Sequence, residues 1–293
     1  MVTIRSPYED SGTWLRGNVH AHTTESDGTR PPEDVIDDYA ARGYDFLALS
    51  DHDTLVDPDE YRSQTGMVLV PAVEVSAGGP HLQHVGASTE VDPDEDRQAV
   101  VDTIDENGGF AVANHPKWLH EFEHWSREEL SRIEGFDGIE IYNGLIQRHA
   151  GAARATDRWD WLLSQGHRLW GVAADDSHRG GDVEEGWTVV QSDERTPAAV
   201  LDALRNGRFY SSTGVTVETV GVDGNELLVS TADADRIRLI SDHGVVQQTV
   251  DSSTATFHLP EQLVRGGDHT YVRVECLGRG GDAAWTQPMF LDS

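Results

Sequence analysis

The sequence predicts an α/β protein with a largely parallel sheet, followed by a small all-β module. Three observations carry this prediction. Strand-like and helix-like segments alternate over the first two-thirds of the 293 residues, and such repeated βα units are typical of barrels and of doubly wound sheets. Near residues 212–214 the pattern changes to short Thr-, Val- and Ile-rich runs between turn pairs. Finally, His and acidic residues follow several predicted strands.

The alternating segments can be assigned in chain order. Short apolar runs that end at polar residues predict strands, whereas prolines or capping signals followed by a terminal glycine predict helices. Ser126 and Glu129 have the spacing of a capping box, which places a helix start at residue 126. The predicted strands are 17–20, 44–50, 67–75, 84–88, 110–113, 138–142, 169–174 and 187–191, and the helices are 32–42, 94–107, 126–133, about 149–165 and 197–206.

The last part of the chain shows no helical periodicity. Its short runs are separated by pairs such as Asp223-Gly224 and His243-Gly244, which favour tight turns between strands. We therefore divide the chain into an α/β domain, 1–212, and a sandwich-like β module, 213–293.

The composition excludes several classes of protein. Lys and Arg total 22 against 52 acidic residues, a net charge of −30, so no basic stripe is present for stable binding to duplex nucleic acid. The single cysteine, Cys276, excludes a disulfide framework and a cysteine-built metal site. The chain has no apolar stretch near the roughly 20 residues of a membrane span and no signal-peptide pattern at its start. We expect a soluble cytoplasmic protein without membrane contact.

The choice of charged residues is itself informative. Lys117 is the only lysine among the 22 basic residues, and Asp outnumbers Glu by 31 to 21. Self-repulsion of such a chain weakens a compact fold, and high salt screens it. This predicts the salt-adapted surface of a halophile; an acidic protein of an ordinary organism is the alternative.

The histidines mark the predicted site. In extended backbone alternate residues face the same side, so His20 and His22 can bind one ion. Further candidates follow or begin later strands, and in a parallel sheet the carboxyl ends of strands converge on one edge. A single such His is usually a hydrogen-bonded structural residue, but the recurrence favours a common site. The further candidates are Asp27, His52, Glu74, His84, His115, Asp176 and His178.

Together these motifs resemble a known family. HAHTTESDG, SDHD, the Glu of PAVEVS, HVG, ANHP and DDSH are similar to the motifs of the PHP (polymerase and histidinol phosphatase) metallohydrolases. The resemblance covers about residues 16–212. It implies a distorted (β/α)7 barrel with two or three divalent ions, Zn, Mn or Fe. The segment IEIYN, 139–143, and the added β module resemble the branch that includes carbamate hydrolases.

The resemblance also implies ligands for three ions. Some members have His where this chain has Asp27, a change that weakens the third site or favours Mn or Fe over Zn there. His81 competes with His84, which is preferred because it directly precedes Val85-Gly86. The implied sets are His20, His22, Glu74 and Asp176 for the first ion, Glu74, His84 and His115 for the second, and Asp27, His52 and His178 for the third.

We expect a phosphoesterase that acts on small phosphomonoesters, nucleotides or short oligonucleotides by metal-activated hydroxide. Glu74, Asp176 and His178 are the expected catalytic residues. The same centre would also serve a carboxyl-ester or carbamate hydrolase. A non-catalytic, metal-stabilised binding module is a third possibility.

A phosphate substrate needs positive charge in so acidic a chain. The ions supply most of it. Lys117, Arg148 and Arg179 lie near the motifs and are candidates for binding the phosphate, with a solvated loop lysine as the alternative for Lys117. Asn143 is a candidate either for a substrate contact or for fixing the end of a strand.

The segment HEFEH, 120–124, matches the zinc-protease pattern His-Glu-x-x-His. That motif requires a helix through both histidines, whereas the capping box starts a helix only at Ser126. We expect a loop instead, which places Trp118, Phe122 and Trp125 at the mouth of the cleft.

Overall fold

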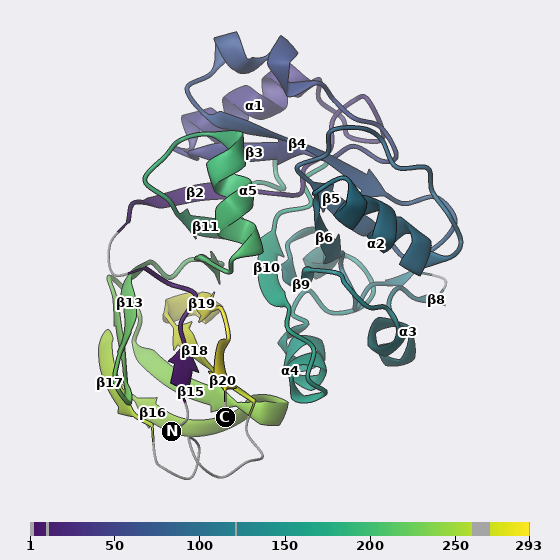
Figure 1. Cartoon of the computed structure of the whole chain (residues 1–293). Helices are drawn as coiled ribbons and strands as arrows, with labels where there is room; N and C mark the ends of the chain where they lie inside the picture. Colours follow the sequence, from purple (N-terminus) through teal and green to yellow (C-terminus); the bar gives the residue numbers. More distant parts are fainter. Residues whose placement is uncertain (1–2, 10–11, 121, 260–269, 293) are drawn as a thin grey trace.

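A strongly curled sheet forms the first part of the protein (Figure 1). The computed structural model describes residues 3–9, 12–120, 122–259 and 270–292. Most residues of the curled part are buried, as the apolar runs of the sequence require. Its seven strands, in spatial order, are β2 (Trp14–Asn18), β3 (Phe46–Leu49), β4 (Val68–Val75), β5 (Leu82–Val85), β6 (Phe110–Ala113), β9 (Gly138–Asn143) and β10 (Trp170–Ala174).

One strand of the seven runs against its neighbours. Strands β2, β3 and β4 are parallel, as are β6, β9 and β10, but β5 pairs antiparallel with both β4 and β6. Beyond β2 and β10, the N–H of His22 donates to the carbonyl of Ser177 (2.8 Å), and that of Asp176 donates to His20 (3.1 Å). These bonds join the first strand of the curl to the last, so the predicted distorted barrel is confirmed.

The helices lie where the capping signals predict them. The N–H of Glu129 donates to the Ser126 hydroxyl (3.2 Å), and that of Ser126 donates to the Glu129 carboxylate (3.0 Å), so the predicted capping box is formed. The helices are α1 (Pro32–Ala41), α2 (Arg97–Glu106), α3 (Arg127–Arg132), α4 (Thr156–Ser164) and α5 (Pro197–Arg205). Among the described residues, no helix has the length and apolar character needed to cross a membrane.

Helix α4 is shorter than the predicted segment 149–165. Gly151 has a φ of 124°, and a Cβ there would lie 2.1 Å from the carbonyl oxygen of Lys117. Gly151 forms a bridge with Trp118, so this stretch pairs with the chain beside the site instead of starting the helix.

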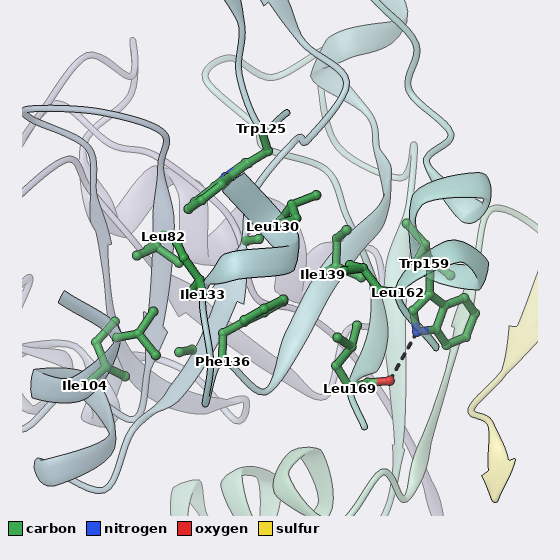
Figure 2. Close-up of a cluster of buried hydrophobic side chains, with 14 of the residues drawn as sticks. Leu82, Ile104, Trp125, Leu130, Ile133, Phe136, Ile139, Trp159, Leu162 and Leu169 are labelled. Atoms are coloured by element: carbon green, nitrogen blue, oxygen red, sulfur yellow. Dashed lines mark hydrogen bonds between the residues drawn. The ribbon is translucent and has the colours of Figure 1, made fainter. Parts of the chain in front are cut away.

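Large apolar side chains pack α2, α3 and α4 against the sheet (Figure 2). Ile104, Trp125 and Trp159 are each at most 1% exposed, and burial of one such side chain contributes about 1.5–3 kcal/mol. The Trp159 indole donates to the carbonyl of Leu169 (3.1 Å), so its polar atom is satisfied inside the core.

The final part of the chain forms the expected sandwich-like module. Two sheets face each other across one buried cluster that includes Leu239, Phe257 and Val274. One sheet contains β13 (Val217–Asp223), β14 (Glu226–Thr231) and β17 (Thr254–His258); the other contains β15 (Arg236–Ser241), β16 (Val245–Val250), β18 (Tyr271–Leu277), β19 (Ala283–Thr286) and β20 (Met289–Asp292).

The module and the barrel are connected through one continuous sheet. Strands β11 (Trp187–Gln191) and β12 (Phe209–Ser212) lie between β2 and β19. Strand β1 (Thr3–Arg5), at the start of the chain, pairs with β20 (Figure 1). The sequence did not indicate that residues 3–5 complete the module; the division at residues 212 and 213 stays a prediction.

Candidate metal centre

Histidines and carboxylates from distant parts of the chain meet at the edge where β2, β3, β4, β6 and β10 end. Parallel strands bring their carboxyl ends to one edge, so motifs separated by up to 158 positions, from His20 to His178, become neighbours. The residues that gather here are His20, His22, Asp27, His52, Glu74, His81, His115, His124, Asp176 and His178.

Glu74 lies at the centre of the cluster. Its side chain is 1% exposed and is surrounded by imidazole nitrogens. Oε1 lies 3.1 Å from His81 Nδ1, 3.1 Å from His115 Nε2 and 3.4 Å from His20 Nε2, and Oε2 lies 3.0 Å from His52 Nδ1 and 3.3 Å from His22 Nε2.

Asp176 is a second carboxylate that contacts the histidines of the cluster. Its Oδ1 lies 3.3 Å from the Nε2 atoms of both His20 and His22, and those two nitrogens are 3.1 Å apart. The backbone of Asp176 has a φ of 54°, a conformation that a non-glycine residue keeps only when its surroundings hold it.

A second group lies nearer the solvent around Asp27. Its Oδ1 is 3.2 Å from His178 Nε2 and 3.6 Å from His52 Nε2. The hydrogen bond with His178 is the main reason that the pKa of Asp27 falls to about 2. Burial lowers the pKa of His178, but the contacts with Asp27 and Asp176 outweigh burial and raise it to about 9.

The inner carboxylates and imidazoles shift one another strongly. Burial alone would raise the pKa of Glu74 and of Asp176, yet the imidazoles around them, His20 foremost, hold both well below the usual range. Burial would lower the pKa of His20, but Asp176, Glu74 and Glu140 raise it well above its usual value. A pocket with so much fixed negative charge attracts cations.

These residues fit divalent ions. Oε2 of Glu74 and Nδ1 of His52 are buried and 3.0 Å apart, yet neither makes a hydrogen bond of good geometry within the described part of the chain. The Nε2 atoms of His20 and His22 face each other at 3.1 Å. Imidazole nitrogens and carboxylate oxygens that converge in this way, with some of them left without a hydrogen bond, are the pattern expected of ligands around ions.

The cluster lines a cavity of about 330 Å³. Its wall also contains Trp118, Leu145 and Ile146, which are apolar, together with His149 and Arg179. The cavity is therefore lined by clustered imidazoles and carboxylates, by apolar side chains and by one guanidinium group.

His84 lies away from the cluster, and His81 occupies the place beside Glu74 that was predicted for His84. Because β5 runs antiparallel to β4 and β6, its start lies at the site and its end lies away from it. His84 is packed against Gly109, burial lowers its pKa to about 4, and neither ring nitrogen has a hydrogen-bond partner among the described residues. His81, directly before β5, contacts Glu74 instead.

Glu140 was not among the predicted site residues. Its Oε1 lies 2.7 Å from His20 Nδ1, and its Oε2 accepts from the backbone N–H of His115 (2.6 Å). Accepting the Nδ1 proton leaves the Nε2 lone pair of His20 facing the cluster. An acidic residue in the otherwise buried strand GIEIYN is a signal that could have identified it.

Asn143 does not belong to the described residues that line the cavity. Its amide NH2 donates to Glu140 (2.9 Å) and to Asp176 (3.1 Å), while its oxygen accepts from the N–H of Ile146 (3.2 Å). All its polar groups are thus committed. These bonds favour the structural alternative, in which Asn143 holds Glu140 and Asp176 in place.

Of the three predicted phosphate-binding cations, only Arg179 lines the cavity. Lys117 pairs with Asp157 (3.0 Å) and Arg148 with Asp182 (2.6 Å), and neither belongs to the described residues that line the cavity. The Arg179 side chain is 64% exposed, and its Nε is 3.5 Å from Asp182.

The HEFEH segment carries no helix in its described residues. It forms the short strands β7 (Leu119–His120) and β8 (Phe122–Glu123), paired antiparallel. Trp118 lines the cavity, as expected, but Trp125 is 1% exposed and belongs to the core. Of the two histidines of this segment, His124 lies among the clustered imidazoles; the side chain of Phe122 lies outside the described part.

Comparisons with known proteins match parts of the sequence. A family model described as PHP-associated matches residues 163–209. A 5'-3' exoribonuclease of Haemophilus influenzae is 37% identical over 62 residues, which are 20% of this chain and 23% of that protein. A 3',5'-nucleoside bisphosphate phosphatase of Chromobacterium violaceum is 37% identical over 82 residues, 27% of this chain and 28% of that protein. The chain thus spans less than a third of either relative.

One solved structure matches almost the whole chain. It is the crystal structure of a two-domain protein from Bacteroides vulgatus that contains a predicted PHP-like metal-dependent phosphoesterase. The match has a TM-score of 0.56 and 18% identity, and it covers 98% of this chain and 89% of the other. The resemblance to the PHP proteins is thereby confirmed in fold; the carbamate-hydrolase branch and the halophilic source stay predictions.

Proposed function

We propose that this chain, a PHP-type protein by its fold and its family-model match, is a metal-dependent phosphoesterase. Small phosphomonoesters, nucleotides and short oligonucleotides are the proposed substrates. The names of both curated relatives, an exoribonuclease and a bisphosphate phosphatase, support phosphate esters as the substrate class.

The arrangement around Glu74 is the observation that carries the proposal. Five imidazole nitrogens approach its two oxygens at 3.0–3.4 Å inside a cavity that reaches the surface. A scaffold that used a metal only for stability would enclose its ligands fully. Here Asp27, His52 and His178 line the open cavity, so a small molecule can reach the cluster.

Each residue would have a defined role toward the ions. When bound, two or three divalent ions supply an acidified water and neutralise the charge of a phosphate ester. Carboxylate-rich sites suit Mn or Fe at least as well as Zn. The proposed ligands are His20, His22, Glu74 and Asp176 for one ion, Glu74, His81 and His115 for another, and Asp27, His52 and His178 for the third.

The remaining residues orient these ligands and the substrate. Glu140 fixes the tautomer of His20, and Asn143 fixes the carboxylate of Asp176. Arg179 offers a guanidinium to a phosphate at the cavity wall. Trp118 and Ile146 form an apolar surface that excludes water from the bound ester group.

The test measures hydrolysis of p-nitrophenyl phosphate and p-nitrophenyl acetate by the whole chain with Mn²⁺ in high salt. We expect turnover of the phosphate ester, and a loss of at least about 10³-fold in kcat/KM for Glu74→Ala and His20→Ala, because each removes a ligand. Turnover of the acetate alone would favour a carboxyl-ester or carbamate hydrolase. Turnover of neither, with metal bound, would favour a binding module.

We also infer that the protein works in a saline cytoplasm. The charge of −30 and the near absence of lysine support this inference.

A further inference from the structure

The backbone of His81 is held by two consecutive side chains. Its N–H donates to His124 Nε2 (2.8 Å), and its carbonyl accepts from the Trp125 indole N–H (3.1 Å) and from the N–H of Asn114 (3.1 Å). His81 precedes β5, so its own N–H lies outside the strand pairing recorded for β5. A ring nitrogen that accepts an N–H must carry its lone pair there, which assigns the proton of His124 to Nδ1.

The two side chains are themselves firmly placed. His124 and Trp125 are 4% and 1% exposed. The backbone N–H groups of His124 and Trp125 donate to the carbonyls of Trp118 (2.9 Å) and Pro116 (3.3 Å). Ser126, the next residue, caps α3, and Trp125 lies in the apolar cluster beside Leu130 (Figure 2). The pair is therefore anchored in the core on one side and reaches the site on the other.

The imidazole of His81 depends on this anchoring. Gly78, Gly79 and Pro80 precede it, and such residues leave the connection from β4 without a regular hydrogen-bond ladder. The direction of a side chain follows from the φ and ψ of its own backbone. Fixing both the N–H and the carbonyl of His81 fixes the direction of its Cα–Cβ bond and limits the rotamers of the ring, whose Nδ1 lies 3.1 Å from Glu74.

We propose that His124 and Trp125 are positioning residues that hold His81 in place as a metal ligand; we name this pair the His81 clamp. The inference rests on the proposed metal centre. It also assigns a role to His124, the second histidine of HEFEH. His124 orients His81 through a hydrogen bond to its backbone, whereas His81 itself contacts Glu74.

The test compares two replacements of His124 in the whole chain. His124→Phe keeps a ring of similar shape but has no acceptor, whereas His124→Gln offers an acceptor oxygen. Titration of the metal-free protein with Mn²⁺ alone, in high salt, should show about 10–100-fold weaker binding at one site for His124→Phe. For His124→Gln, we expect an affinity within about three-fold of the wild type.

A double-mutant cycle separates positioning from general structural damage. In a His81→Ala background, His124→Phe should weaken Mn²⁺ binding no further, because the ligand that it positions is already gone. Undiminished Mn²⁺ affinity in His124→Phe, or an equal additional loss in the His81→Ala background, would overturn the clamp.

A second variant covers the case in which His124→Phe does not fold. Trp125→Phe removes only the indole donor to the His81 carbonyl. It should weaken Mn²⁺ binding at the same site in the wild-type background, and weaken it no further in the His81→Ala background. His84→Leu replaces a buried histidine outside the cluster and should bind Mn²⁺ like the wild type. Clamp-dependent Mn²⁺ binding without phosphate-ester hydrolysis would support the clamp and refute the proposed function.

Discussion

Glu140 is a buried carboxylate that is hydrogen-bonded to several residues of the site. It contacts His20 through one oxygen, and through the other it binds the N–H of His115 and the amide of Asn143, which in turn holds Asp176. His115 and Asp176 both have positive φ, 28° and 54°, so their backbones need such support. Three of the proposed ligands thus depend on a residue that does not belong to the described cavity lining.

Replacing Glu140 by Gln tests this dependence. The amide oxygen can still accept from His115 and Asn143, but the NH2 then faces His20 Nδ1 and donates to it, which moves the His20 proton to Nε2, the nitrogen that faces the cluster. We expect Mn²⁺ affinity to fall by about 10–100-fold while the fold is retained. Glu275→Gln, a buried carboxylate in the β module, is the matched control. Equal metal content in both variants, measured by elemental analysis, would contradict the role of Glu140.

At the scale of elements, the direction of one strand decides which histidine lies beside Glu74. The sequence predicts a strand near 84–88, and its motif HVG favours His84. The strand found is Leu82–Val85, and it runs antiparallel to its neighbours, so its beginning meets the site. Periodicity along a chain locates a strand but does not state its direction, because direction depends on the partners with which the strand pairs.

Contacts between elements also join the barrel to the β module. Asp160 in α4 accepts two hydrogen bonds from Arg273 in β18 (2.8 and 2.7 Å), and both side chains are at most 7% exposed. Arg273→Met leaves the Asp160 charge buried beside Tyr271, and we expect a loss of about 3–5 kcal/mol in the free energy of unfolding. Urea unfolding at constant high salt measures the loss.

The control for this pair is Arg279→Met. The Arg279 side chain is 90% exposed and pairs with Asp235 at 3.4 Å, and we expect a change within about 0.5 kcal/mol. Similar losses in the two variants would show that burial of the Arg273 pair has no special effect on stability.

At the scale of the whole molecule, net charge sets the conditions under which the fold is stable. A charge of −30 over 293 residues repels itself at low ionic strength. Above about 1 M salt the screening length falls to about 3 Å, so we expect Tm to rise steadily from 0.1 to 2 M KCl. Calorimetric scans check this with metal-loaded and with metal-free protein. A highest Tm in the most dilute buffer would contradict adaptation to salt.

Much of the molecule follows from the sequence alone. Alternating βα segments predict the barrel, and turn pairs predict the β module. The His-x-His, Asp-His and Asp-x-His motifs after predicted strands indicate a metal centre, because side chains at the ends of parallel strands must converge. His20, His22, Asp27, His52, Glu74, His115, Asp176 and His178 were chosen in this way, and they lie together.

Only the tertiary structure decides the partners of each residue. It exchanges His84 for His81 through the direction of β5, turns Asn143 and Glu140 into supports, and pairs Lys117 with Asp157 away from the cavity. A motif records which chemical groups a chain carries and their local spacing. Which groups meet depends on contacts between residues distant in sequence, and those contacts form only when strands and helices pack around a shared core.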